Sequence, residues 1–161
     1  MGNHSVRPTD DELENVVNNY FNMLFRLCFT ILGNSADAED AVSEVFLKYI
    51  SKPTAFNGEE HRKAWLIRVA TNVCRNMRRR PALCNIDDFE QLAAEERDRA
   101  VLEEVMRLPE KYRTVIYLHY IEGYRVAEIG TMLRISLSAA KKRLQYARQR
   151  LRIEYEKEGH I

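Results

Sequence analysis

A chain of 161 residues suits one domain or two small ones, and 45% hydrophobic with 30% charged residues is typical of an ordinary globular protein. No run of about 18 apolar residues occurs, so we expect no insertion into a membrane. The three cysteines are widely spaced and form no C-x-x-C motif, which argues against a disulfide framework or a zinc site. The opening residues lack the apolar core of a signal peptide, and we therefore expect a cytoplasmic protein.

Apolar residues recur at helical spacing nearly everywhere, which predicts an all-α fold. In the first part of the chain, three helices are expected, at about residues 10–32, from after Ser35 to before Pro53, and at about 60–79. Pro81 then interrupts the pattern, because proline cannot continue a helix. Beyond it, four more helices are expected, at about residues 94–107, 109–122, 126–133 and 137–155.

This pattern predicts two small helical domains, 1–80 and 94–161, joined by a linker at 81–93. Cys28 and Cys74 stand among apolar residues and are expected in the core, whereas Cys84 lies near Pro81.

The net charge of +1 conceals a strong segregation of charge. Residues 61–80 carry seven Lys and Arg and no acid, and residues 135–152 carry six and no acid. The stretch between them, from Asn85 to Val105, is strongly acidic. Two basic blocks separated by an acidic one suggest two contacts with a polyanion, joined by a segment that avoids it.

The second basic block predicts a helix shaped for the major groove of DNA. Its apolar side consists of Leu137, Ala140, Leu144, Ala147 and Leu151. The opposite side carries Ser138, Lys142, Gln145, Tyr146 and Gln149 at its crest, with Arg143, Arg148, Arg150 and Arg152 on its two shoulders. Polar side chains at the crest can contact base edges while cations on the shoulders meet the phosphates.

The residues before this helix strengthen the prediction. Residues 126–133 form a short amphipathic helix pattern, and the "RIS" that follows makes a tight turn with Ser136 as the expected N-cap. A short helix, a brief turn and a basic amphipathic helix constitute a helix-turn-helix. On charge alone a solvated basic helix in a bundle explains the segment equally well, but the tandem arrangement favours DNA binding.

The first basic block carries a second candidate surface. Arg68, Asn72, Arg75 and Arg79 recur about one helical turn apart. Arginine can hold phosphate and asparagine can contact a base edge, although an ordinary solvated face would show the same pattern. Trp65 is more often a core anchor than a base-stacking platform. The preceding loop, residues 56–58, could form a pocket for an unstacked base.

Three segments, in chain order, resemble those of the bacterial extracytoplasmic-function (group IV) RNA polymerase sigma factors. They are "LGNSADAEDAVSEVFLKY", "AWLIRVATNVCRNMRRR" and "LPEKYRTVIYLHYIEGYRVAEIGTMLRISLSAAKKRLQYARQRLR". The resemblance implies a subunit that recruits core RNA polymerase to chosen promoters. Its N-terminal domain would open and contact the −10 element, and its C-terminal domain would contact the −35 element as a duplex. An anti-sigma factor is a candidate further partner.

The resemblance, together with the two basic faces, assigns candidate site residues. The acidic residues that would dock on the clamp helices of the largest polymerase subunit are Asp37, Asp40 and Glu44, whose pattern alone also fits a solvated acidic face. The −10 candidates are Phe56, Asn57, Gly58, Trp65, Arg68, Asn72 and Arg75, with Asn72 at the position that contacts the flipped base. The −35 candidates are Ser138, Lys141, Lys142, Arg143, Gln145, Tyr146 and Arg148.

Two positions depart from the family pattern. The turn, commonly L-G-I-S, is L-R-I-S here, so that Arg134 stands where a left-handed backbone would be slightly strained. The start of the last helix, often G-T-V, is "SAA". The second departure puts the identity of the −35 sequence in question but leaves the helix-turn-helix intact.

Two other classes of function were weighed. A stand-alone helix-turn-helix regulator explains the C-terminal part but neither the "DAED" helix nor the first basic block. A small nuclease could in principle hold a metal with Asp87-Asp88 and Glu95-Glu96. No H-E-x-x-H motif, P-loop or cluster of His and Cys occurs, so we expect no catalytic residues, no metal and no cofactor.

Overall fold

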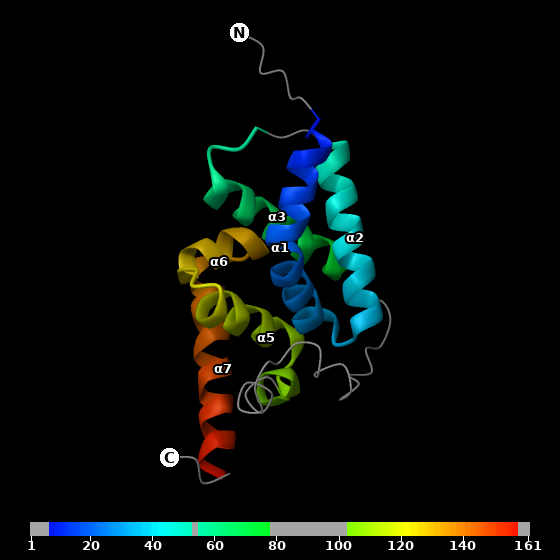
Figure 1. Ribbon diagram of the computed structural model, residues 1–161. Helices are drawn as coiled ribbons and strands as arrows, with labels where there is room; N and C mark the ends of the chain where they lie inside the picture. Colours follow the sequence, from blue (N-terminus) through cyan, green and yellow to red (C-terminus); the bar gives the residue numbers. More distant parts are fainter. Residues whose placement is uncertain (1–6, 53–54, 78–102, 158–161) are drawn as a thin grey trace.

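The computed structural model describes residues 7–52, 55–77 and 103–157, and all regular elements within these ranges are helices (Figure 1). They are α1 (Asp10–Leu32), α2 (Ser35–Ser51), α3 (Glu59–Met77), α5 (Glu110–Ile116), η2 (Tyr117–Ile121), α6 (Val126–Leu133) and α7 (Leu137–Lys157), and residues 103–107 are helical as well. The all-α prediction is confirmed. None of the described helices is long and apolar enough to cross a membrane.

Capping residues explain where the first two helices begin and end. Thr9 and Glu12 form a capping box at the start of α1, because each backbone N–H donates to the other's side chain, at 3.2 and 3.1 Å. Gly33 ends α1 in the left-handed conformation, with φ of 82°, as its position in the sequence predicts. α2 begins one residue earlier than expected because Asn34 is its N-cap and accepts a hydrogen bond from the Asp37 N–H at 2.8 Å.

The prediction of one α-helix over residues 109–122 is wrong in two respects. Pro109 is the N-cap of α5 and lies outside the helix, with ψ of 146°. After seven residues the α-helix gives way to the π-helix η2, in which the Glu122 N–H donates to the Tyr117 carbonyl at 3.2 Å. A sequence pattern with about 3.6 residues per turn gives no sign of this wider turn.

The helices pack into an N-terminal and a C-terminal half, and the two halves share a core. The N-terminal half consists of α1, α2 and α3, and the C-terminal half consists of α5, η2, α6 and α7. Ala38, Val42, Val45, Phe46 and Tyr49 recur at helical spacing along α2, and all five are buried. Because α1 also packs on α5, and α3 on α6, the buried side chains of both halves form one continuous core that includes Cys28 and Cys74 (Figure 1). Cys84 and Arg79 lie outside the described residues.

We call the contact between the two halves the junction, and Arg113 of α5 is one of its polar links. The guanidinium donates to the carbonyl of Ile31 in the last turn of α1 at 2.9 Å and to that of Met106 at 3.2 Å. The last carbonyls of a helix have no partner within the helix. Arg113 therefore satisfies an acceptor of the N-terminal half with a donor of the C-terminal half.

A second polar link of the junction joins three side chains. Lys63 of α3 lies 3.0 Å from the carboxylate of Glu122, which also accepts a hydrogen bond of 2.9 Å from the Tyr117 hydroxyl. Burial, and then the neighbouring charge of Glu122, raise the pKa of Tyr117 above its ordinary value. The phenol therefore remains protonated at physiological pH and continues to donate to Glu122.

We expect Arg113→Ala to lower the free energy of unfolding by about 1–3 kcal/mol, because two partly buried carbonyls lose a charged donor. Urea unfolding followed by circular dichroism would measure this loss. Arg68→Ala is the matched control, since Arg68 is an exposed arginine of α3, and it should change stability by at most about 0.5 kcal/mol. Equal losses in the two variants would contradict a structural role for the Arg113 link.

Candidate nucleic-acid interface

The turn between α6 and α7 has the geometry expected of a helix-turn-helix. Arg134 adopts the left-handed conformation, with φ of 56° and ψ of 44°, in agreement with the expected strain at this position. The Ile135 N–H donates to the Gly130 carbonyl at 2.9 Å, and a Cβ added at Gly130 would lie 3.1 Å from the Ile135 carbonyl oxygen. Glycine at 130 therefore lets the turn approach α6 closely. Ser136 is the N-cap of α7, as predicted, because its hydroxyl accepts the Ala139 N–H at 3.0 Å.

The faces of α7 agree with the sequence pattern except at its first residue. Ala140, Leu144 and Ala147 are buried, as predicted. Leu137 was expected to share that side, but its side chain is 46% exposed, whereas Ile135, in the turn just before, packs against the core. The solvent-exposed −35 candidates are Ser138, Lys141, Lys142, Gln145, Tyr146 and Arg148, and Arg143 is half-buried.

Two residues of this exposed face are already held by aromatic neighbours, which the sequence analysis missed. The Arg148 guanidinium donates to the Tyr120 hydroxyl and lies over the Tyr120 ring at 5.4 Å. The Tyr146 ring packs against Tyr112, with 4.3 Å between the centroids. Because Tyr120 belongs to η2, the π-helix sets the position of Arg148. The aromatic-rich segment "YLHYI" was the one signal in the sequence that could have drawn attention to it.

The α3 face is only partly free. Arg68 is exposed and Asn72 is half-buried, whereas Arg75 donates to the Leu133 carbonyl at the end of α6, at 3.0 Å. Arg75, a −10 candidate, thus contacts the helix-turn-helix of the other half. This contact joins residues 58 positions apart and has no signature in a helical periodicity.

The loop before α3 is ordered by its aromatic side chain and by His61. The Phe56 ring is stacked on Tyr49, with 6.0 Å between the centroids, and meets the edge of Trp65 at 5.7 Å. Phe56 and Trp65 therefore act first as packing residues. Nδ1 of His61 accepts the Asn57 N–H at 3.0 Å, which leaves the exposed Asn57–Gly58 backbone in a fixed conformation.

The acidic residues of α2 differ in their exposure and in their contacts. Asp37 accepts a hydrogen bond of 2.8 Å from the Asn34 amide and is half-buried, so it completes the cap of its own helix. Asp40 and Glu44 are exposed, and Glu44 lies 3.8 Å from Lys48. Leu47 lies near the same face, one turn beyond Glu44, and its side chain is 64% exposed.

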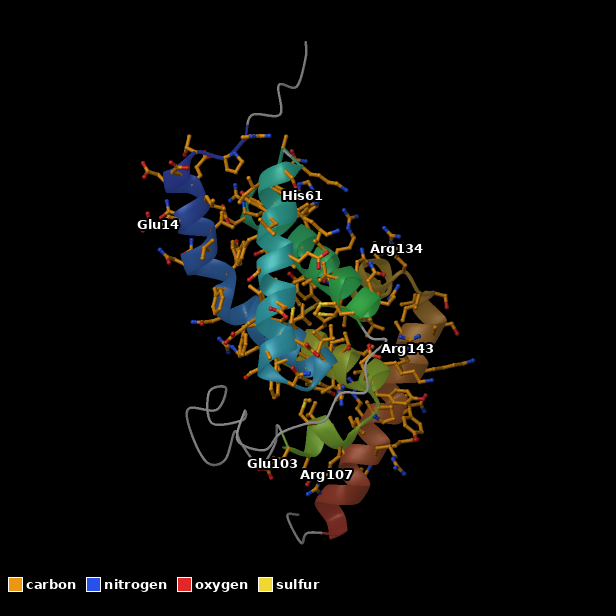
Figure 2. All side chains as sticks on the ribbon, turned by 90° about the vertical axis from the view of Figure 1, so that its right-hand side faces the viewer. Glu14, His61, Glu103, Arg107, Arg134 and Arg143 are labelled. Atoms are coloured by element: carbon orange, nitrogen blue, oxygen red, sulfur yellow. The ribbon has the colours of Figure 1, made fainter. Side chains whose placement is uncertain are left out.

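The loop before α3 and the α7 surface lie apart on the molecule, although Arg75, farther along α3, reaches the end of α6. In Figure 2, His61 marks the loop before α3 at the upper end, whereas Arg134 and Arg143 follow each other down the right-hand side. A partner that contacts both the loop and the α7 surface must therefore be extended.

Comparison with known proteins decides the family. Family models for sigma-70 region 2 and sigma-70 region 4 match residues 16–82 and 98–151. The ECF RNA polymerase sigma factor SigL of Mycobacterium tuberculosis is 30% identical over 151 residues, which cover 85% of this chain and 85% of SigL. The chain belongs to the family of ECF RNA polymerase sigma factors.

Further relatives agree with this assignment. SigW of Bacillus subtilis, an ECF sigma factor, is 28% identical over 164 residues, which cover 88% of each chain. The solved structure of CnrH in complex with the cytosolic domain of CnrY has the same fold, with a TM-score of 0.66, 21% identity, and coverage of 92% of this chain and 90% of the matched one. The chain is thus a promoter-recognition sigma factor, and the alternative of a stand-alone regulator is not favoured.

We expect His61→Leu to weaken binding of the sigma factor–polymerase complex to single-stranded −10 DNA about two- to tenfold, because the Asn57 N–H loses its acceptor. His61→Gln is the matched control, since glutamine near the start of a helix can accept the same bond through its side-chain oxygen. Fluorescence anisotropy with labelled −10 oligonucleotides would measure both. If the two variants are impaired equally, the hydrogen bond does not position the loop.

Proposed function

We propose that this sigma factor contacts promoter DNA and core polymerase through three surfaces. The exposed crest of α7 contacts the −35 element, α3 with residues 56–58 contacts the −10 element, and α2 docks on the clamp helices of the largest polymerase subunit. The observation that carries the proposal is the geometry of α7, where exposed polar and basic residues lie opposite a buried apolar stripe at the end of a helix-turn-helix. It acts in the cytoplasm as an initiation factor without catalysis of its own.

At the −35 element, the division between crest and shoulders follows from the exposure of α7. Lys142 and Gln145 are exposed and point away from the buried Leu144, so they are placed to meet base edges. Arg148, held by Tyr120, is placed to meet a phosphate, since the aromatic contact fixes its guanidinium before DNA arrives.

At the −10 element, Asn72 and Arg68 remain the candidates for direct contact. Phe56 and Trp65 support the loop from behind, and the exposed Asn57 and Gly58 face a captured base. Arg75 is exposed, but one of its five N–H donors is bonded to the Leu133 carbonyl, so only part of its guanidinium can reach DNA while this bond holds. We therefore propose that the isolated protein binds promoter DNA weakly and that core polymerase, by fixing the two halves on its surface, raises the affinity.

On α2, an exposed leucine beside two exposed carboxylates is more typical of a protein-binding surface than of a surface that only faces solvent. Leu47 supplies apolar area and Asp40 and Glu44 supply charge that complements a basic surface. We propose that this face binds the polymerase and that Asp37 acts through the helix cap. An anti-sigma factor is a proposed further partner, in line with the solved relative CnrH, which is bound to the cytosolic domain of CnrY.

The function is tested by run-off transcription with purified core polymerase on genomic fragments. We expect transcripts with defined start sites that require the sigma factor, and upstream of them a pair of shared sequence elements. A repeat without core polymerase should give no transcript. Promoter-specific binding by the free protein at physiological salt, with no dependence on polymerase, would support a stand-alone regulator instead.

We expect the double charge reversal Asp40→Lys and Glu44→Lys to reduce polymerase pull-down at least about tenfold, because attractive charge pairs become repulsive. Both side chains are exposed, so circular dichroism and stability should change by no more than about 0.5 kcal/mol per site. Glu39→Lys is the matched control, an exposed carboxylate of the same helix on another face. Pull-down that stays unchanged in the double variant would exclude this face as the docking surface.

We expect Gln145→Ala and Lys142→Ala each to cost about 1–3 kcal/mol on the best −35 sequence and to relax the preference at one base. Arg148→Ala should instead weaken binding to all sequences alike and lower the salt slope by about one unit. Titrations of a −35 duplex library at several salt concentrations would separate the two behaviours. A shift of base preference in Arg148→Ala alone would mean that the assignment of crest and shoulder is reversed.

A further inference from the structure

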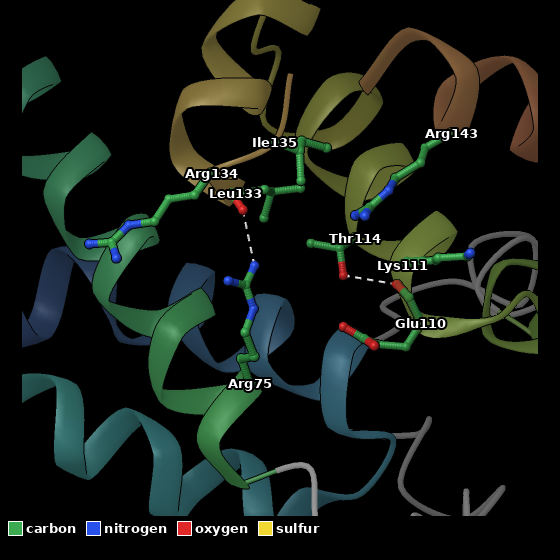
Figure 3. A pocket seen from close by; sticks show the side chains of 8 residues that line it. All are labelled: Arg75, Glu110, Lys111, Thr114, Leu133, Arg134, Ile135 and Arg143. Atoms are coloured by element: carbon green, nitrogen blue, oxygen red, sulfur yellow. Dashed lines mark hydrogen bonds between the residues drawn. The ribbon is translucent and has the colours of Figure 1, made fainter. Parts of the chain in front are cut away.

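A pocket of about 340 Å³ opens at the junction, between α3, α5, α7 and the turn that precedes α7 (Figure 3). We call it the junction pocket. Its lining residues are Arg75, Glu110, Lys111, Thr114, Leu133, Arg134, Ile135 and Arg143. Among the residues that the structure describes, four cations and one carboxylate line this space, and the cations come from both halves of the molecule.

The cations take different positions in the pocket. In Figure 3, the guanidinium groups of Arg75 and Arg143 point into the space from two different helices, whereas Arg134 and Lys111 extend away at its two sides. Arg75 donates one of its five N–H groups to the Leu133 carbonyl, at 3.0 Å. The remaining donors of Arg75, and those of the half-buried Arg143, are available to a guest in the pocket.

Glu110 is the opposing charge in this space. Its carboxylate also points into the pocket in Figure 3, where it repels an anion and attracts both guanidinium groups. Among the described lining residues, and with the two flanking cations included, positive charge still exceeds negative charge. A carboxylate at this place makes the affinity for an anion moderate and gives the site a residue whose removal should strengthen binding.

We propose that the junction pocket binds a small phosphate compound with at least two negative charges, of about the size of pyrophosphate. Guanidinium groups hold phosphate oxygens with pairs of parallel hydrogen bonds, and two of them facing one space can hold two phosphate groups. The volume lies at the small end of the range of about 300–1,000 Å³ that is typical of ligand sites. Such a guest bridges α3 and α7 and so ties the two halves together.

This binding goes beyond promoter recognition and competes with it. Arg75 and Arg143 are candidates for the −10 and −35 contacts, respectively, and a phosphate compound in the pocket occupies both. The phosphate chemistry could also come from the DNA backbone itself, so the experiment must separate a small free anion from duplex DNA.

The test is isothermal titration calorimetry of sodium pyrophosphate into the full chain at constant ionic strength without DNA. We expect saturable binding with one site, which Arg143→Gln and Arg75→Gln each weaken about tenfold or more. Glu110→Gln should strengthen binding about three- to tenfold, because it removes the like charge. Arg150→Gln is the matched control, since it makes the same charge change on α7 outside the pocket and should leave the affinity unchanged.

Several outcomes would overturn the proposal. Absence of saturable binding excludes a pyrophosphate site, and equal losses in Arg143→Gln and Arg150→Gln show a diffuse charge effect. Weaker binding of pyrophosphate by Glu110→Gln would contradict the expected repulsion between Glu110 and the anion. A separate titration with duplex DNA distinguishes the two phosphate sources: if Glu110→Gln strengthens the binding of duplex DNA but not that of pyrophosphate, the DNA backbone is the ligand. Because the pyrophosphate titration itself uses no DNA and no polymerase, its result is independent of the transcription test.

Discussion

The rest of the structure depends on the junction, where an apolar core continues from one half of the molecule into the other. Each half is small, and a small helical unit buries too little surface to be very stable by itself. Packing of α1 on α5 and of α3 on α6 extends both cores at once. Polar side chains at the edge, Arg113 and Glu122 among them, satisfy donors and acceptors that the apolar contact would otherwise leave without partners.

The same junction affects both the stability of the protein and the exposure of its α3 face to DNA. Arg75 belongs to the face that the family resemblance assigns to the −10 element, yet its guanidinium is bonded to the end of α6. The closed arrangement and full exposure of that face are therefore alternatives, and any partner that prefers one shifts the other. Core polymerase and a small anion in the junction pocket would act on this equilibrium in opposite directions.

Much of the fold could be predicted because its signals are local. The bounds of α1 follow from Gly33 and from the apolar spacing, and α6, the turn and the start of α7 follow from a short amphipathic pattern and Ser136. The π-helix could not be predicted in this way, because its wider turn departs from the period of about 3.6 residues by which an α-helix is recognised in a sequence. The exposure of Leu137 could not be predicted either, because Ile135, in the turn before α7, packs against the core and helical periodicity does not cover a turn residue.

For the candidate sites, too, the features with local signals could be predicted and the others could not. Exposure of Lys142 and Gln145 could be deduced from their place on a helix, and so could that of Asp40 and Glu44. Contacts between distant residues could not, and they change the roles of individual side chains. Asp37 is used by its own helix cap, and Arg148 is held by Tyr120 of η2. The junction pocket combines residues from both halves and leaves no trace in any single segment.

The left-handed Arg134 has a consequence for how freely this turn can vary. A residue with a Cβ costs about 1–2 kcal/mol in that conformation relative to glycine. Glycine, however, gives the unfolded chain more conformations to lose on folding, which offsets about 0.4–1 kcal/mol of that advantage. The net penalty for arginine is therefore small. Selection can set the residue at 134 mainly by its charge, so that one turn can be adjusted to different anionic surroundings while the helix-turn-helix keeps its stability.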